Sequence, residues 1–180
     1  NSASLELTAN AGAAAPSGAG GPADSGAVGT IYTKDPGQNG FHLQLISVST
    51  PVGAFNTFTS PVVIDTFTVQ SAWLRFTSTF TVSSMTVRAG AELYFSTNGM
   101  SSVGALTMQA GALMEHSTNT AVSSHTIKLS ISGNFDLQAG ATINVAGKGY
   151  AGGAGRVKGN GPGGGLSAGG PGGGGGGHDG

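Results

Sequence analysis

The chain has 180 residues, which is enough for one compact domain with flanking segments. Only 8% of its residues are charged and its formal net charge is −1, so it lacks the clustered basic face that DNA, RNA or an anionic membrane requires. The absence of cysteine excludes a disulfide framework and a thiolate metal site. No stretch approaches the roughly 20 apolar residues of a membrane span, and we therefore expect no membrane insertion. Because the chain begins at Asn1, we expect a processed protein, or a piece of a longer one, from which any export signal has been removed.

Glycine divides the chain into three zones. Residues 1–40 are rich in glycine and alanine, and include two short strand-like runs, SLELTANAG and TIYTK, with Pro-Gly and Asn-Gly turn signals at the end. Residues 41–145 contain few glycines and gather the β-branched and aromatic residues in short alternating runs, which predict strands. Residues 146–180 hold 19 of the 34 glycines. We expect an all-β core over residues 41–145 with glycine-rich flanks.

The strands of the middle zone repeat one frame, in which apolar and polar residues alternate before an Ala-Gly-Ala corner and a second apolar run. The four copies are FTVQSAWLRF from Phe67, MTVRAGAELYF from Met85, LTMQAGALMEH from Leu106 and FDLQAGATINV from Phe135. Equivalent positions lie 18, 21 and 29 residues apart, and the first copy lacks the glycine. A period near 20 that tolerates insertions indicates a solenoid of stacked coils.

The frame predicts a right-handed parallel β-solenoid (β-helix), in which each strand pairs with its equivalent one coil away. Alternate apolar residues then point into a narrow core, and glycine at the corner allows a positive φ. The variable segments 96–105 and 116–126 are expected to project outward as loops. The predicted inward side chains are Val69, Leu74, Val87, Leu93, Met108, Leu113, Leu137 and Ile143. An ordinary β-sandwich is the alternative. The turns of a sandwich are not expected to repeat the same residues at equivalent positions, as the Ala-Gly-Ala corners do here.

The arm at residues 146–180 admits two interpretations. Its composition is that of a flexible linker, which cannot bury enough apolar surface to offset the entropy of ordering. Glycine-rich chain without a strict G-X-Y period can instead form extended, polyproline-II-like strands that pack closely against a neighbouring segment or another copy.

The two ends of the chain resemble the glycine-rich β-helix modules of very large repetitive bacterial cell-surface and filament proteins. The resemblance rests on Ala-Asn-Ala-Gly followed by Gly-Thr-Ile-Tyr-Thr-Lys-Asp in residues 5–40, and on Gly-Ala-Thr-Ile-Asn-Val-Ala-Gly-Lys-Gly-Tyr running into polyglycine in residues 126–180. It implies a secreted or cell-surface protein of which these residues form one repeat. It carries over no catalytic residue.

The sequence contains no arrangement of residues typical of a catalytic or cofactor site. Enzymatic β-helices need several carboxylates on one face, yet Glu92 and Glu115 lie two and four residues after their corner glycines, and Asp136 lies four before its own. The other carboxylates are Glu6, Asp24, Asp35, Asp65 and Asp179, and the histidines are His42, His116, His125 and His178. His116 and His125 flank one loop, but two imidazoles without a carboxylate make a weak metal site.

Two further motifs are set aside. Gly147-Lys148-Gly149 lacks the preceding glycine, the following Ser/Thr and the helix of a phosphate-binding loop. Alternating threonines such as Thr66 and Thr68 suggest an ice-binding array, but the Thr-x-Thr units do not recur at one place in each coil, and threonine is also an ordinary strand-surface residue.

We therefore predict a non-enzymatic, extracellular structural protein without a cofactor, metal or catalytic residue, which assembles with copies of itself into a filament or stalk. The alternative is an adhesin module that binds a glycan or host surface through the variable loops.

Overall fold

The computed structural model describes residues 30–34, 41–46, 55–154 and 157–165. These residues form strands and no helix, and no part of them is a helix long and apolar enough to cross a membrane. The strands are β1 (Thr30–Lys34), β2 (Phe41–Ile46), β3 (Asn56–Phe58), β4 (Val62–Gln70), β5 (Trp73–Phe76), β6 (Phe80–Val87), β7 (Glu92–Phe95), β8 (Ser101–Met108), β9 (Leu113–His116), β10 (Leu129–Ile131), β11 (Phe135–Leu137) and β12 (Thr142–Asn144).

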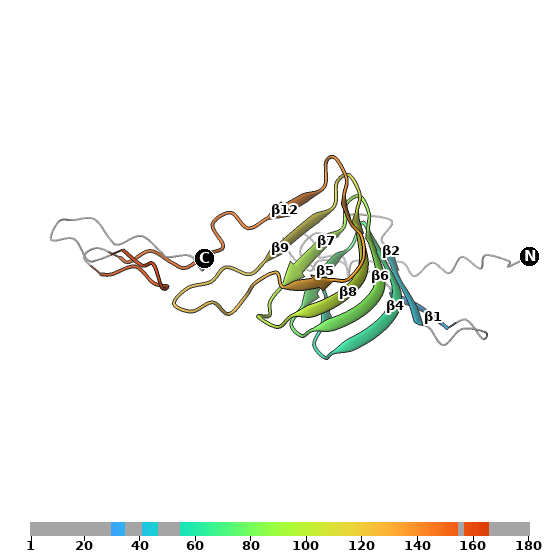
Figure 1. The fold of residues 1–180 in the computed structure, drawn as a ribbon, viewed down its shortest axis with the longest axis horizontal. Coiled ribbons are helices and arrows are strands. Elements are labelled where there is room, and N and C mark those ends of the chain that lie inside the picture. The colour runs from blue at the N-terminus through green and yellow to red at the C-terminus, as the bar shows by residue number, and fades with distance from the viewer. Residues whose placement is uncertain (1–29, 35–40, 47–54, 155–156, 166–180) are drawn as a thin grey trace, which may run out of the picture.

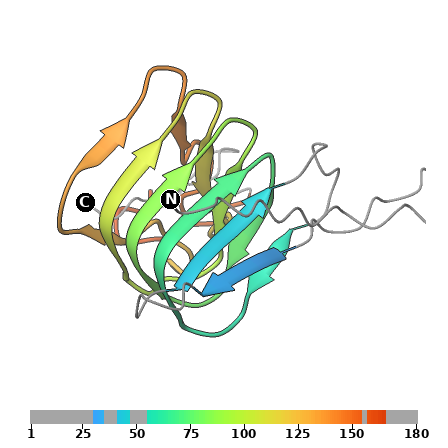
Figure 2. The ribbon, with the colours of Figure 1, turned by 90° about the vertical axis from the view of Figure 1, so that its right-hand side faces the viewer.

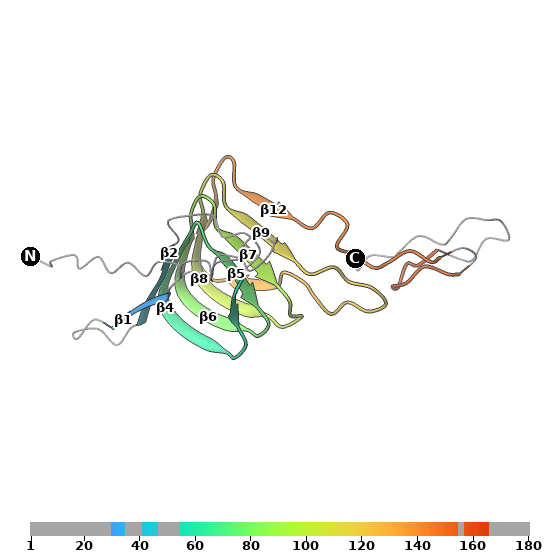
Figure 3. The same cartoon turned by 180° about the vertical axis from the view of Figure 1, so that it is seen from behind.

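The strands stack into two facing sheets (Figures 1 and 3). One sheet runs in the order β1-β2-β4-β6-β8-β10, with β11 also on β8, and the other runs β12-β9-β7-β5-β3. Every pairing is parallel except β1 on β2, which is antiparallel. The predicted parallel β-solenoid is therefore confirmed. Each coil contributes one long and one short strand, β4 with β5, β6 with β7 and β8 with β9, so that equivalent residues of successive coils are neighbours.

The long strands bend in the middle, as Figure 2 shows. In β6 the alternation of buried and exposed residues is interrupted at Ser83 and Ser84, both exposed, before it resumes with Met85. The pairing of β6 with β8 is interrupted at the same place. Val82 pairs with Val103 and Ser84 pairs with Ala105, but the residues between them, Ser83 and Gly104, form no pair. Two successive outward residues turn the strand around the core. In the last coil this bend separates β10 from β11.

The corners confirm the role predicted for the repeated glycines. Gly90, Gly111 and Gly140 have φ of 72°, 79° and 88°, the left-handed region that costs other residues strain. Their backbones stack, with Gly111 N donating to Gly140 O at 2.9 Å and Gly90 N donating to Gly111 O at 3.1 Å. In the copy without glycine, Ser71 occupies the corner with φ of 50° and is the only non-glycine residue with positive φ in the described ranges.

Most of the predicted inward side chains are confirmed, Leu113 is wrong, and two others lie in inward columns without being buried. Val69, Leu74, Val87, Leu93 and Met108 are fully buried. Leu113 is only half-buried, because the register pairs it with outward-facing Glu92, whereas Met114 pairs with Leu93 and is buried in its place. Leu137 and Ile143 occupy inward columns but remain 46% and 41% exposed, because none of the described residues forms a further coil over them.

The variable segment at 96–105 is shorter than predicted. Only residues 96–100 form a loop, since β8 begins at Ser101. Ser101 and Val103 are buried. The alternation of buried and exposed side chains in β8 therefore begins at Ser101, earlier than the polar residues of this segment indicate. Residues 117–128 form no strand, in agreement with the second predicted loop.

Of the flanking segments, only parts are described. In residues 1–40 the structure describes β1, and the strand predicted within residues 4–12 lies outside the described residues, as does the polyglycine of residues 166–180.

Candidate assembly and binding surfaces

The coil formed by β10, β11 and β12 leaves the end of the hydrophobic core uncovered. Phe135 pairs with Leu106, Leu137 with Met108 and Ile143 with Met114, and these three partners are no more than 1% exposed. In the last coil, by contrast, the exposed fractions are 47% for Phe135, 46% for Leu137, 41% for Ile143 and 51% for Val145. We call these four residues the open end. The partners of Phe135, Leu137 and Ile143 are core residues, and Val145 lies two residues beyond Ile143 on the same side of the chain. One more coil would therefore bury all four positions.

The two ends of the solenoid differ in backbone pairing. At the N-terminal end, antiparallel β1 covers the edge of β2. At the other end, β10, β11 and β12 pair on one side only within the described part of the chain. Figure 2 shows β1 and the last coil at opposite margins of the seven-stranded sheet. Unpaired strand edges carry free N–H and C=O groups that favour pairing with another chain.

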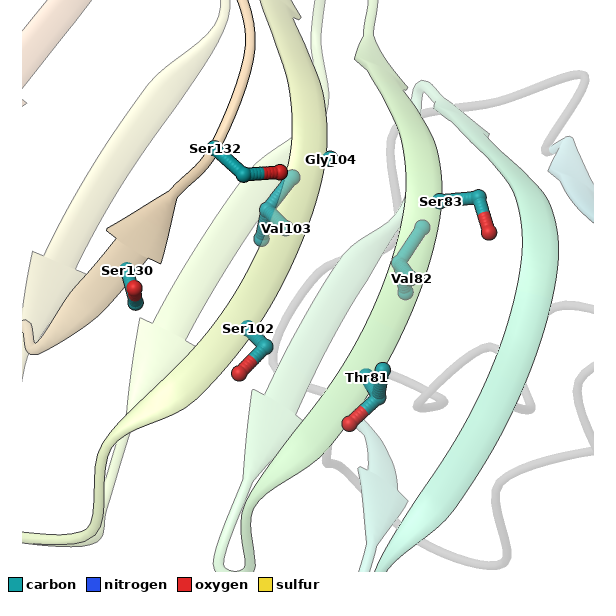
Figure 4. A pocket seen from close by; sticks show the side chains of 8 residues that line it. All are labelled: Thr81, Val82, Ser83, Ser102, Val103, Gly104, Ser130 and Ser132. Carbon is teal, nitrogen blue, oxygen red and sulfur yellow. The ribbon is translucent and has the colours of Figure 1, made fainter.

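A hydroxyl-lined hollow lies on the outer face of the seven-stranded sheet, across β6, β8 and β10 (Figure 4). It has a volume of about 340 Å³. The side chains of Val82 and Val103 turn away into the core, and Gly104 lies between Ser83 and Ser132. The residues that line it are Thr81, Val82, Ser83, Ser102, Val103, Gly104, Ser130 and Ser132.

Gly104 allows β6 and β8 to approach closely beside this hollow. A Cβ on Gly104 would lie 2.2 Å from the carbonyl oxygen of Ser83, so no side chain fits between the two strands at the bend. The same column is glycine in the next coil, where Gly133 N donates to Gly104 O at 2.7 Å. The sequence contains the signal for this close approach, a glycine within an alternating run, but the segment was predicted to be a loop.

The outer face of the five-stranded sheet carries an aromatic and charged cluster. The ring of Phe55 packs 5.5 Å from Trp73 and 5.2 Å from Tyr94, measured between centroids. The guanidinium of Arg75 lies 4.2 Å from the centroid of Phe55, and the Lys148 amine lies 5.4 Å from that of Tyr94. Both are cation–π contacts. The members of the cluster contact one another and therefore shield one another from solvent.

Two carboxylates border this cluster. Glu92 pairs with Leu113 and Glu115 pairs with Tyr94, so the prediction that they occupy different columns is confirmed. Nevertheless they interact: burial raises the pKa of Glu92, the nearby negative charge of Glu115 raises it further, and Lys148 opposes both. Lys148 Nζ lies 3.2 Å from Glu115 Oε1. Sequence reasoning missed this ion pair, because it joins residues 33 positions apart.

The two loop histidines lie in different surroundings. His116 occupies the inward column that holds Phe95, and its Nδ1 is bonded to Ser117 O at 2.7 Å. His125 is held through its backbone, since its N–H donates to Asn119 Oδ1 and its carbonyl accepts from Asn119 Nδ2. Among the described residues, no three His, Asp or Glu side chains gather closely enough to hold a metal ion. Glu6, Asp24, Asp35, His178 and Asp179 lie outside the described residues.

Asn119 also joins the loop to the start of the glycine-rich arm. Its backbone N–H donates to Lys148 O, and Ala151 N donates to Thr120 O, both at 3.0 Å. Gly147, with φ of 67°, makes the turn that precedes these bonds. Gly147-Lys148-Gly149 therefore links the last coil to the loop.

Threonines of three successive coils form one column, which has Gln44 before them and Asp136 after them. Thr68 pairs with Thr86, and Thr86 pairs with Thr107. The neighbouring column does not continue the array, since Thr66 is followed by Ser84 and Ala105. The complete Thr-x-Thr unit occurs in only one of these three coils.

Comparison of the chain with known protein families, with characterised proteins and with solved structures finds no match. The function is therefore argued from the surfaces described above.

Proposed function

We propose that this protein is an extracellular structural subunit that stacks end to end with copies of itself to build a filament or stalk. The observation that carries the proposal is the open end, where four apolar residues on core columns are about half exposed. The location outside the cell, at a bacterial surface, rests on the resemblance of the glycine-rich ends to modules of repetitive surface proteins.

Burial of the open end supplies a driving force for association. A fully buried aliphatic or aromatic side chain contributes about 1.5–3 kcal/mol, so covering the exposed half of each residue contributes about 1 kcal/mol, and the four contribute about 4 kcal/mol. Hydrogen bonds along the edges of β10, β11 and β12 add to this sum. The low charge of the chain leaves little electrostatic repulsion between stacked copies.

The difference between the two ends favours an open assembly. The last coil of one copy would meet the N-terminal end of the next, where β1 and β3 are the outermost strands of the two sheets. Such a contact joins two different surfaces, the last coil of one copy and the N-terminal end of the next. Contacts of this kind generate filaments when the rotation between successive copies does not close a ring.

Sedimentation velocity and electron microscopy of the purified chain at increasing concentration test the proposal. The double variant Leu137→Glu/Ile143→Glu places charges on the open end, and its matched control is Val63→Glu, because Val63 is 73% exposed on the side of the solenoid. We expect fibres from the wild type and the control and monomers from the double variant. A monomeric wild type at every concentration, or fibres from the double variant, would refute stacking through this end.

A further inference from the structure

We infer that the hydroxyl-lined hollow on β6, β8 and β10 is a binding site for a neutral saccharide. None of the four open-end residues lines it, although β10 of the last coil contributes to it. Of the two variable segments on which the adhesin alternative placed binding, only 96–105 contributes to the hollow, through residues that form part of β8.

The chemistry of the lining determines the class of ligand. Five hydroxyl-bearing residues line the hollow, Thr81, Ser83, Ser102, Ser130 and Ser132 (Figure 4). Each hydroxyl can both donate and accept a hydrogen bond, as can each hydroxyl of a sugar. No ionisable side chain lines the hollow, so it offers nothing to balance the charge of a phosphate, a carboxylate or an amine.

The five hydroxyls are available to a ligand. Within the described part of the chain, none of them makes a hydrogen bond to another protein group. Hydroxyls elsewhere on the solenoid are used internally: Ser96 and Ser117 bond to each other at 2.7 Å, and Thr126 donates to Asn98 at 2.9 Å.

The dimensions also fit a sugar. Three neighbouring strands about 4.8 Å apart make a row roughly 10 Å wide, formed by Thr81, Ser102 and Ser130, which the register places in one column. The volume of about 340 Å³ lies at the small end of the range for ligand pockets. Gly104, which also lines the hollow, presents only backbone to a sugar ring.

A peptide strand fits this surface less well. A peptide that adds to a sheet uses a free backbone edge, which among the strands lining the hollow only β10 offers, since β6 and β8 are paired on both sides. A peptide added there would lie beside the hollow and not over the hydroxyls of β6 and β8. With three or four net hydrogen bonds at an open surface, we expect a dissociation constant of the order of 1 mM.

Saturation-transfer difference NMR with the full chain tests the site, with maltose and cellobiose as neutral probes and glucuronic acid as the charged comparison. We expect transfer to at least one neutral disaccharide and none to glucuronic acid. The double variant Ser102→Ala/Ser130→Ala should weaken binding about tenfold, since it removes two hydrogen bonds. Thr107→Val, on β8 outside the hollow, should leave the affinity within twofold of the wild type.

The variants also separate binding from folding and assembly. Equal urea midpoints of the double variant and the wild type would show that the serines do not act through stability, and sedimentation would show whether assembly has changed. No transfer to either disaccharide, or equal affinity in the double variant and the wild type, would overturn the assignment whether or not the protein forms fibres.

Discussion

Substitution of Gly104 by alanine is the sharpest test of the packing at the strand bend. Its new Cβ would lie 2.2 Å from Ser83 O, whereas ordinary contact begins near 3.4 Å, so β6 and β8 must separate by about 1.2 Å. Overpacking of this kind costs about 1–3 kcal/mol, and a ladder hydrogen bond stretched by this amount costs about 1 kcal/mol more. We therefore expect Gly104→Ala to lower the free energy of unfolding by about 2–4 kcal/mol.

Two other glycines separate the effect of space from that of backbone conformation. Gly111 has room for a Cβ, with its nearest contact at 3.6 Å, but has φ of 79°, so Gly111→Ala should cost about 1–2 kcal/mol. Gly149 has neither a close contact nor a positive φ, and its replacement by alanine should be neutral or stabilise by up to about 1 kcal/mol. Urea unfolding followed by the fluorescence of Trp73, the single tryptophan, measures all three. If Gly104→Ala cost no more than Gly111→Ala, the close approach of the two strands would be refuted.

Three further predictions concern the core, the first corner and the partly buried carboxylate of Glu92. Met114→Ala should lower the free energy of unfolding by about 2–5 kcal/mol and Leu113→Ala by less than about 1.5 kcal/mol, in urea titrations; equal costs would contradict the register. Ser71→Gly should stabilise by up to about 1 kcal/mol, because it relieves the positive φ, and a lower thermal midpoint would count against that strain. Because the pKa of Glu92 is raised above 4.5, its ionisation destabilises the fold as pH rises through the folded pKa, and acidification toward 4.5 relieves this effect. Glu92→Gln should thus increase stability more at neutral pH than below pH 4.5, and an equal gain at both would show that charge is not the cause.

The sequence alone determined the class of fold and the position of the corners. Alternation in MTVRAGAELYF and its relatives is a local property with a period of two, and Ala-Gly-Ala marks a turn wherever it recurs, so four copies in register specify stacked coils. The same frame contained the information that Met114, and not Leu113, faces inward, because Met114 aligns with Leu93 and Ile143.

The tertiary structure decided which surfaces are exposed and which distant residues meet. Leu137 has the pattern of a core residue, but its exposure depends on whether another coil follows, which is a property of the stack and not of the local sequence. The contact of Lys148 with Glu115 depends in the same way on the arm returning to β9, in the coil before the last. The hydroxyl hollow requires three strands placed side by side, because Thr81, Ser102 and Ser130 become neighbours only through the register of the sheet. Hydrophobic periodicity is a property of residues that are neighbours in the sequence. These features depend on residues of different coils, which become neighbours only when the coils stack.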